Sequence, residues 1–353
     1  MNIAAKCPAL WKQKGFTLLE LVLVLFLIGL LASAGLLFTD NLRDDAQFDE
    51  TQRRLEMIRK AIIQSGERTV NNQPELSGFV VDNGRLPYCL EELLFVDTTV
   101  AVSGTNEVES PCNDTGELTI KQPGVTSDGI RYGWWGPYIQ VQPDQDGGRR
   151  FRDGYENAFV NVSVVAPAAI EENSGWLWTL KASDMTPLSS PVQAIDPMAY
   201  TLSVSSVGFD LNSSMDDYPP TGSETLITSD AWLAQDTYTV RFFNVDQTTA
   251  VSGIPLSDPA YKWTLTLANS ASNFSTDAIT IAASSIPAAG SGNNAVDETA
   301  TFSSRIPAGH YRVSLTCENS PGDCVTENVS TPYRVIVFPR QQLAPIRWNV
   351  KPR

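Results

Sequence analysis

The chain has 353 residues, of which 40 are Asp or Glu and 25 are Lys or Arg, and its formal net charge is −15. This acidic balance argues against nucleic acid as a partner and suits a body that lies outside the cytoplasm. The basic run at residues 149–152 lies among Asp144, Asp146 and Asp153 and does not change this conclusion.

An apolar stretch near the start of the chain predicts a transmembrane helix. Between residues 21 and 38 only Gly29, Ser33 and Gly35 interrupt the apolar side chains. A helix that starts at Phe16 therefore has the roughly 20 apolar residues that a bilayer core requires. We predict that residues 16–39 span a membrane. Lysines precede this stretch and an acidic chain follows it, which predicts a cytoplasmic N-terminal end and an exported C-terminal region.

Glu20 is a carboxylate inside the apolar stretch, where an unpaired charge costs roughly 2–4 kcal/mol. A secretory signal peptide explains the segment less well, because the apolar run is long and no clear cleavage site follows it before Asp40. Residues 15–20, Gly-Phe-Thr-Leu-Leu-Glu, instead resemble the processing site of type IV prepilins and type II secretion pseudopilins.

This resemblance implies a processing pathway and a role for three residues. Prepilin peptidase would cut after Gly15, remove residues 1–15 as a leader and methylate the new N-terminus at Phe16. In these filaments the carboxylate at Glu20 would meet the N-terminal ammonium group of a neighbouring subunit, so that assembly neutralises the charge. The alternative is a single-pass anchor in which Glu20 faces a water defect in the bilayer.

The helical pattern continues beyond the apolar stretch. Apolar residues recur at helical spacing, with charged residues on the other faces, at Phe48, Leu55, Ile58 and Ile62. We therefore predict one long helix over residues 16–66, with Gly66 as its end. Its second half should carry a globular head on the apolar stripe.

The next segment, residues 67–182, is predicted to form a pilin-like α+β head. Residues 83–87 resemble the Gly-Arg-x-Pro element that follows the long helix in many pilin-like proteins. Residues 134–138 resemble the Trp-x-Gly-Pro-Tyr element of major pseudopilins, and the turn after it, at residues 151–159, matches that family only in part. The resemblance covers about residues 14–182.

Within the head, residues 103–129 are predicted to be loop, because they are rich in Gly, Ser, Thr, Asn and Asp. Residues 159–165 are predicted to form a strand that pairs with residues 176–180. Major pseudopilins bind calcium near their C-terminal loops, and here oxygen ligands could come from Asp144, Asp146 and Asp153. A solvated turn is the competing interpretation of these acidic residues.

The cysteines predict disulfide bonds. Cys7 lies in the leader, and an even number remains in an exported chain: Cys89, Cys112, Cys317 and Cys324. Three pairings exist, and we favour Cys89–Cys112 and Cys317–Cys324 because each pair lies within one predicted domain. Zinc is a poor alternative, since the chain has no CxxC sequence and a single histidine, His310.

Prolines and small polar residues at 183–197 predict a linker, and residues 198–353 predict an all-β antiparallel sandwich. Eight alternating runs indicate its strands, at residues 200–206, 224–228, 237–243, 262–267, 278–282, 299–303, 311–317 and 333–338. Residues 306–313 are similar to a turn-and-strand element of immunoglobulin-like and fibronectin-type domains, in which a tyrosine, here Tyr311, stabilises the corner.

No catalytic set emerges, because His310 stands alone and no GxSxG, P-loop or HExxH sequence occurs. We expect no enzyme activity and no cofactor. The first hypothesis is a minor pilin or pseudopilin subunit in the bacterial inner membrane and then in a filament, with other pilins, prepilin peptidase, an assembly platform and lipid as partners. The alternative is a membrane-anchored adhesin or substrate-recognition protein, whose β-domain would bind a glycan or surface ligand. Sugars could stack on exposed Trp232, Trp263 and Trp348, although a core position explains Trp263 better.

Overall fold

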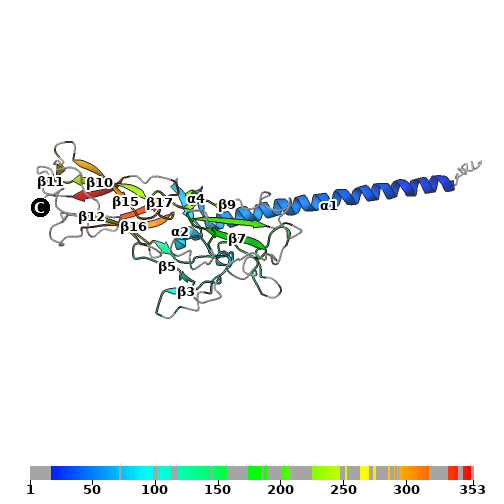
Figure 1. Cartoon of the computed structure of the whole chain (residues 1–353), viewed down its shortest axis with the longest axis horizontal. Coiled ribbons are helices and arrows are strands. Elements are labelled where there is room, and N and C mark those ends of the chain that lie inside the picture. Colours follow the sequence, from blue (N-terminus) through cyan, green and yellow to red (C-terminus); the bar gives the residue numbers. More distant parts are fainter. Residues whose placement is uncertain are drawn as a thin grey trace, which may run out of the picture.

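A long helix projects from an elongated body made mostly of β-strands (Figure 1). The computed structural model describes residues 17–70, 73–97, 102, 104–112, 118–143, 145, 147–156, 174–183, 187–188, 200–206, 208, 225–246, 251–252, 263–269, 273–275, 285–286, 290, 292, 294–317, 333–340 and 345–350. A helix with a head, followed by mostly antiparallel sheets, confirms the predicted fold class.

The projecting helix, α1 (Leu18–Ile62), has 45 residues. At 1.5 Å per residue it is about 68 Å long. The backbone becomes extended at Ile63 and strand β1 begins at Gln64. The helix thus ends before the predicted limit at Gly66, because this segment pairs in a hairpin instead of continuing the helix.

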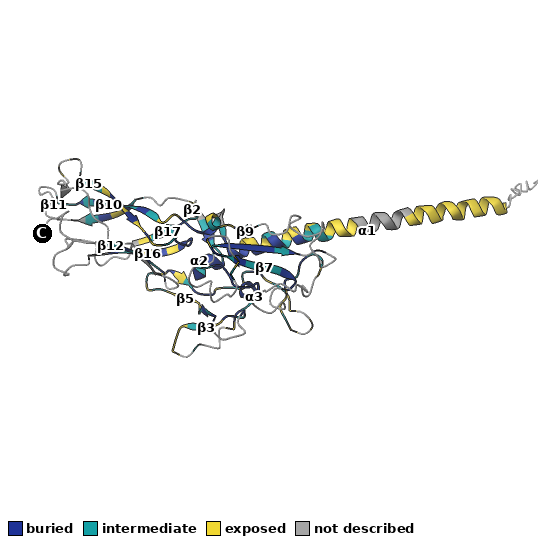
Figure 2. Cartoon of the chain, viewed as in Figure 1, coloured by how far each residue is buried: buried dark blue, intermediate teal, exposed yellow. Residues whose placement is uncertain are grey.

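The two halves of α1 differ in burial (Figure 2). Apolar side chains between Leu18 and Leu31 are exposed, whereas Leu55, Ile58 and Ile62 are buried against the body. The amphipathic spacing of the second half is therefore confirmed. Thr51 joins the buried stripe one turn earlier, although it is polar.

The head begins with short elements. β1 (Gln64–Val70) pairs with β2 (Gln73–Ser77), and two short helices follow, α2 (Phe79–Asn83) and α3 (Glu91–Leu94). Two further antiparallel hairpins are β3 (Glu107–Glu109) with β4 (Thr119–Lys121), and β5 (Gly124–Val125) with β6 (Arg131–Tyr132).

The loop predicted for residues 103–129 is thus wrong in part. Val108 and Ile120 are register partners on β3 and β4, and both are buried in the core. Their burial stabilises a hairpin whose polar neighbours gave no alternating signal.

The third sheet of the head crosses the predicted linker. β7 (Trp176–Lys181) pairs with β8 (Thr201–Ser206), which pairs with β9 (Thr225–Ile227). We predicted β8 and β9 for the second domain, yet their buried residues Leu202, Val204 and Ile227 belong to the same core as the buried stripe of α1. The strand predicted at residues 159–165 lies outside the described residues.

A second core lies between two sheets that follow α4 (Ser229–Trp232). One sheet has the order β15-β10-β18 and the other β13-β12-β16-β17, and β11 and β14 form a separate two-stranded antiparallel pair. The strands are β10 (Thr237–Asn244), β11 (Val251–Ser252), β12 (Trp263–Ala268), β13 (Asn273–Ser275), β14 (Ser285–Ile286), β15 (Ala295–Thr301), β16 (Gly309–Cys317), β17 (Tyr333–Val337) and β18 (Ile346–Val350). This part is the β-domain below.

The β-domain corrects two expectations. β10 and β18 run parallel, so the domain is not wholly antiparallel. Trp232 is 0% exposed and Trp348 is 4% exposed, because each fills a core, so neither offers the exposed ring that stacking on a sugar requires. The side chain of Trp263 lies outside the described residues.

Tyr311 stabilises a corner, as the resemblance of residues 306–313 implied. Its ring is buried, and its hydroxyl donates to the carbonyl oxygen of Pro307, four residues upstream, at 2.9 Å. Just before the corner, Ala308 donates its N–H to the carbonyl of Trp232 at 2.7 Å and Ala234 donates to Ile306 at 2.8 Å. These bonds fasten the β-domain to α4.

Candidate functional site

The start of α1 holds the predicted processing and assembly residues. Gly15 and Phe16 lie outside the described residues. Thr17 is extended and caps the helix, since its hydroxyl oxygen accepts the N–H of Glu20 at 3.3 Å. Thr17 and Glu20 have the spacing of a capping box, in which the acidic side chain can also bond back to the cap. Within the described part of the chain, Glu20 has no ion-pair partner.

The surface around Glu20 is apolar. Leu18 is 83% exposed, Phe26 64% and Leu31 73%, which leaves a helix surface that the rest of the described chain does not cover. Among the described residues, no helix meets the length and hydropathy required to cross a membrane. The predicted span at residues 16–39 also includes Phe16 and the side chains of residues 34–39, which lie outside the described set.

A loop of the head is hydrogen-bonded to the second half of α1. Gly154 donates its N–H to the hydroxyl oxygen of Thr51 at 2.9 Å, and that hydroxyl donates to the carbonyl of Gln47 at 2.8 Å. A Cβ atom on Gly154 would lie 2.1 Å from the Gln47 carbonyl oxygen, so only glycine allows this approach. Arg54 adds two bonds to the loop, because its Nη1 donates to the carbonyls of Arg152 and Asp153 at 2.9 and 3.0 Å.

The same loop is tied to the sheet behind it. Asp153 is buried, and its carboxylate accepts the hydroxyl hydrogen of Ser206, on β8, at 2.5 Å. Trp176, on β7, donates its Nε1–H to the carbonyl of Phe151 at 2.8 Å. The loop therefore connects α1 to the sheet β7-β8-β9. We call residues 151–154 with Thr51 and Arg54 the helix clasp.

Of the three predicted calcium ligands, only Asp153 lies among the residues that the structure describes. Asp144 and Asp146 lie outside the described residues, while Asp153 belongs to the helix clasp. No group of three His, Cys, Asp or Glu side chains is placed to hold a metal ion in the part of the chain that the structure describes. Calcium binding at these aspartates stays a prediction.

A cavity of about 340 Å³ lies beside this segment, between the end of α3 and residues 147–150. Glu91 and Asp97 line it together with Arg149 and Arg150. Burial raises the pKa of Glu91 to about 7, against the opposing influence of Arg150. Side chains of both charge signs therefore line this cavity, together with the apolar Phe95 and Val96.

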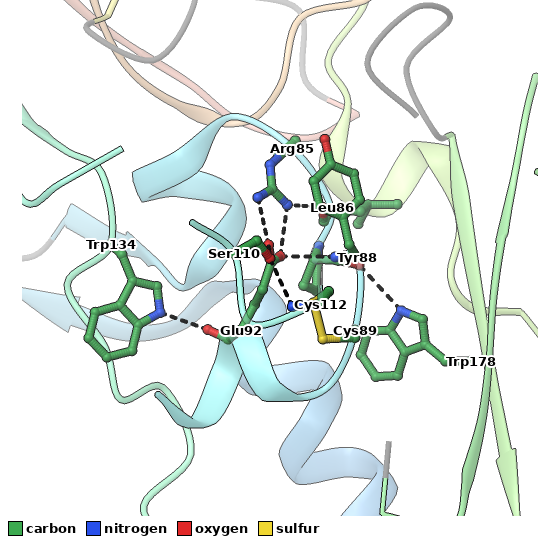
Figure 3. The surroundings of a disulfide bond; sticks show 10 residues. Arg85, Leu86, Tyr88, Cys89, Glu92, Ser110, Cys112, Trp134 and Trp178 are labelled. Carbon is green, nitrogen blue, oxygen red and sulfur yellow. Dashed lines mark hydrogen bonds and ion pairs between the residues drawn. A yellow bond between two sulfur atoms is a disulfide. The ribbon is translucent and has the colours of Figure 1, made fainter. Parts of the chain in front are cut away.

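The predicted Cys89–Cys112 disulfide is present and lies beside a buried ion pair (Figure 3). The Glu92 side chain is fully buried and accepts two hydrogen bonds of 2.8 Å from the guanidinium of Arg85. Ser110 donates its hydroxyl to the same carboxylate at 2.6 Å, and Tyr88 donates its backbone N–H at 2.9 Å. The carboxylate thus joins the segments on both sides of the disulfide.

Arg85 comes from the predicted Gly-Arg-x-Pro element. Its guanidinium lies 3.8 Å from the ring centre of Tyr88 and 5.2 Å from that of Phe79. Burial disfavours its charge, but the carboxylate of Glu92, together with the nearby hydroxyls of Tyr88 and Tyr138, more than offsets this and raises the pKa of Arg85 above its ordinary value. Cys324 and the side chain of Cys317 lie outside the described residues, so that pairing stays a prediction.

Sequence reasoning missed the residues that hold the head on α1. Thr51 precedes Leu55 by one turn and lies on the same stripe, so a polar residue at a core position was the available signal. Nothing local distinguishes the buried Glu92 from the half-buried Glu91 beside it. Arg54 lies among the charged residues of the predicted helix. Its hydrogen-bond partners, the carbonyls of Arg152 and Asp153, lie far away in the sequence.

Comparison with family models finds the prokaryotic N-terminal methylation motif at residues 12–36. Comparisons with curated proteins and with solved structures find no match. The motif covers the predicted cleavage site, Glu20 and the apolar half of α1. The N-terminal segment is therefore of the type IV pilin or pseudopilin kind, and the predicted resemblance is confirmed there.

Replacing Gly154 with alanine should loosen the helix clasp. The added methyl group would collide with the Gln47 carbonyl, and overpacking of this kind typically costs about 1–3 kcal/mol. We expect lower thermal stability and faster hydrogen exchange in residues 51–54 of the detergent-solubilised chain. Gly29→Ala is the matched control, because nothing lies within 4 Å of the position of its added Cβ. Equal effects of the two substitutions would contradict the clasp.

Replacing Arg85 with methionine should destabilise the head strongly. It leaves the Glu92 carboxylate buried without its cation, a change that costs about 3–5 kcal/mol. Urea unfolding followed by tryptophan fluorescence would measure this loss. Arg59→Met is the control, since it removes an exposed ion pair with Glu56 and should cost no more than about 1 kcal/mol. A small loss for Arg85→Met would show that the buried pair does not hold the head together.

Proposed function

We propose that this chain is the precursor of a minor subunit of a type IV pilus or type II secretion filament. One observation carries the proposal. The methylation motif at residues 12–36 runs into α1, and the described chain leaves the apolar first half of that helix uncovered. The motif supports a pilin-like or pseudopilin-like precursor. The uncovered helix supports burial of this half in lipid first, and among the helices of neighbouring subunits after assembly.

Processing would create the N-terminal ammonium group that pairs with the Glu20 carboxylate. Cleavage after Gly15 gives Phe16 a free amino group about one helical turn before Glu20. An unpaired carboxylate in an apolar environment costs roughly 2–4 kcal/mol. Pairing with the N-terminal ammonium group of a neighbouring subunit would remove much of this cost. The Glu20 backbone N–H donates to the Thr17 hydroxyl, and the Glu20 carboxylate has no ion-pair partner within the described part of the chain.

The β-domain favours a minor subunit over a major one. It adds a second core beyond the head, and it lies at the end of the body opposite to the projecting half of α1 (Figure 1). A domain of this size on every subunit would crowd a filament in which the heads pack around closely spaced helices. We therefore infer that the chain occurs at few positions, with its β-domain projecting outward.

The proposal sets a location and partners. The precursor would cross the bacterial inner membrane once, with its head and β-domain in the periplasm, and then enter the filament. Its partners would be prepilin peptidase, the assembly platform and other pilin-like subunits. It assigns no catalytic role to the chain. Trp232 and Trp348 cannot stack on a sugar as the adhesin alternative expected, since both rings are buried.

Replacing Glu20 with valine should leave processing intact and impair incorporation. Valine removes the carboxylate that pairs with the neighbouring N-terminus, while the cleavage site at Gly15 and Phe16 is unchanged. The measurement is the fraction of processed chain recovered with sheared filaments from a host that has the assembly machinery. Asp49→Val is the control, since Asp49 is an exposed acidic residue in the second half of α1. Normal recovery of the Glu20 variant would exclude the charge-pair mechanism.

A further inference from the structure

Three arginines converge where the head meets the β-domain. Arg131 lies on β6 of the head, and Arg312 and Arg334 lie on β16 and β17 of the β-domain. Arg312 and Arg334 are direct register partners, so two like charges face each other across neighbouring strands. All three are exposed. We call them the junction arginines.

The hairpin β5-β6 reaches the β-domain at this point. Asp128, in its turn, lies 3.5 Å from the guanidinium of Arg312, and only 12% of the Asp128 side chain is exposed. The guanidinium of Arg334 lies over Gly129, where an added Cβ would be 3.3 Å from Nη2. Side chains of the head and the β-domain thus form one surface.

His310 and Trp135 lie in the same surroundings. Partial burial lowers the pKa of His310, and the nearby positive charges of Arg334 and Arg131 lower it further, so the ring stays neutral at neutral pH. The guanidinium of Arg131 lies 4.4 Å from the ring centre of Trp135, which is 39% exposed. The surface therefore combines positive charge with an accessible aromatic ring.

The carboxylates of the described chain leave part of this charge uncompensated. Asp128 faces Arg312, and the half-buried Asp82 lies near Arg131. Within the described residues, Arg334 has no carboxylate at ion-pair distance. Like charges placed directly opposite on neighbouring strands are unfavourable, so an added carboxylate between Arg312 and Arg334 would be stabilising. A guanidinium pair of this kind fits carboxylate oxygens with two hydrogen bonds each.

We propose that the junction arginines, with Trp135 beside them, dock a carboxylate-rich segment of a partner polypeptide. The net charge of the chain favours such a segment over nucleic acid. The positive charge is local in a chain of net charge −15, and the chain as a whole would repel a nucleic acid. An acidic peptide needs only a few carboxylates at the junction and can place an apolar side chain on the ring. This inference does not depend on the role in a filament.

Binding of a fluorescein-labelled octaglutamate peptide to the detergent-solubilised full chain would test the proposal by fluorescence anisotropy. At low salt, on the order of 50 mM, we expect saturable binding that weakens as the salt concentration rises. The double variant Arg312→Gln/Arg334→Gln should bind about tenfold or more weakly, because two charge-assisted pairs are lost. Arg334→Lys should restore part of the affinity lost in Arg334→Gln.

The chain offers a matched control on its other sheet. Arg241 and Arg347 are also register partners on neighbouring strands, and both carry a guanidinium on the outer face. The variant Arg241→Gln/Arg347→Gln removes the same charge and should bind the peptide as the wild type does. Equal loss in both double variants, or no loss at the junction, would overturn the proposal. So would tighter binding of an oligothymidylate of the same length. If the double variant unfolds, the peptide affinity of the single variant Arg334→Gln is the deciding measurement, since Arg334 has no ion pair to lose in the described chain.

Discussion

The two halves of one continuous helix have different environments, since one half is uncovered and the other packs against the head. The rest of the described structure depends on this constraint. The first half of α1 presents apolar side chains that the body leaves exposed, while the second half is buried against the head. A globular protein in water normally covers an apolar surface of this extent. The proposed function assigns lipid, and then other helices, as the partners of this uncovered half, and the methylation motif at residues 12–36 covers the same segment.

The helix clasp attaches the second half of α1 to the head. Gly154, Thr51 and Arg54 fasten the helix to a loop, and Asp153 continues the connection to Ser206 on β8. Behind them the ion pair of Arg85 and Glu92 fixes the segments beside the disulfide. The β-domain is in turn joined to the segment of α4 by backbone hydrogen bonds near the corner at Tyr311.

The sequence allowed prediction of features that depend on local spacing. The apolar run, the stripe at Leu55, Ile58 and Ile62, and the corner tyrosine are all visible within a few residues. The features that were missed depend on pairs far apart in the chain. Gly154 meets Thr51, β7 pairs with β8 across a segment that looked like a linker, and β10 pairs in parallel with β18. No periodicity encodes such contacts, because each depends on how complete elements pack.

In the proposed function, this chain is processed and methylated at its N-terminus before it enters a filament. The most direct measurement is the intact mass and N-terminal peptide mass of the wild-type chain isolated from membranes that contain prepilin peptidase. We expect a chain that lacks residues 1–15 and begins at Phe16 with one added methyl group. A chain that retains these residues, or begins elsewhere without the methyl group, would contradict it.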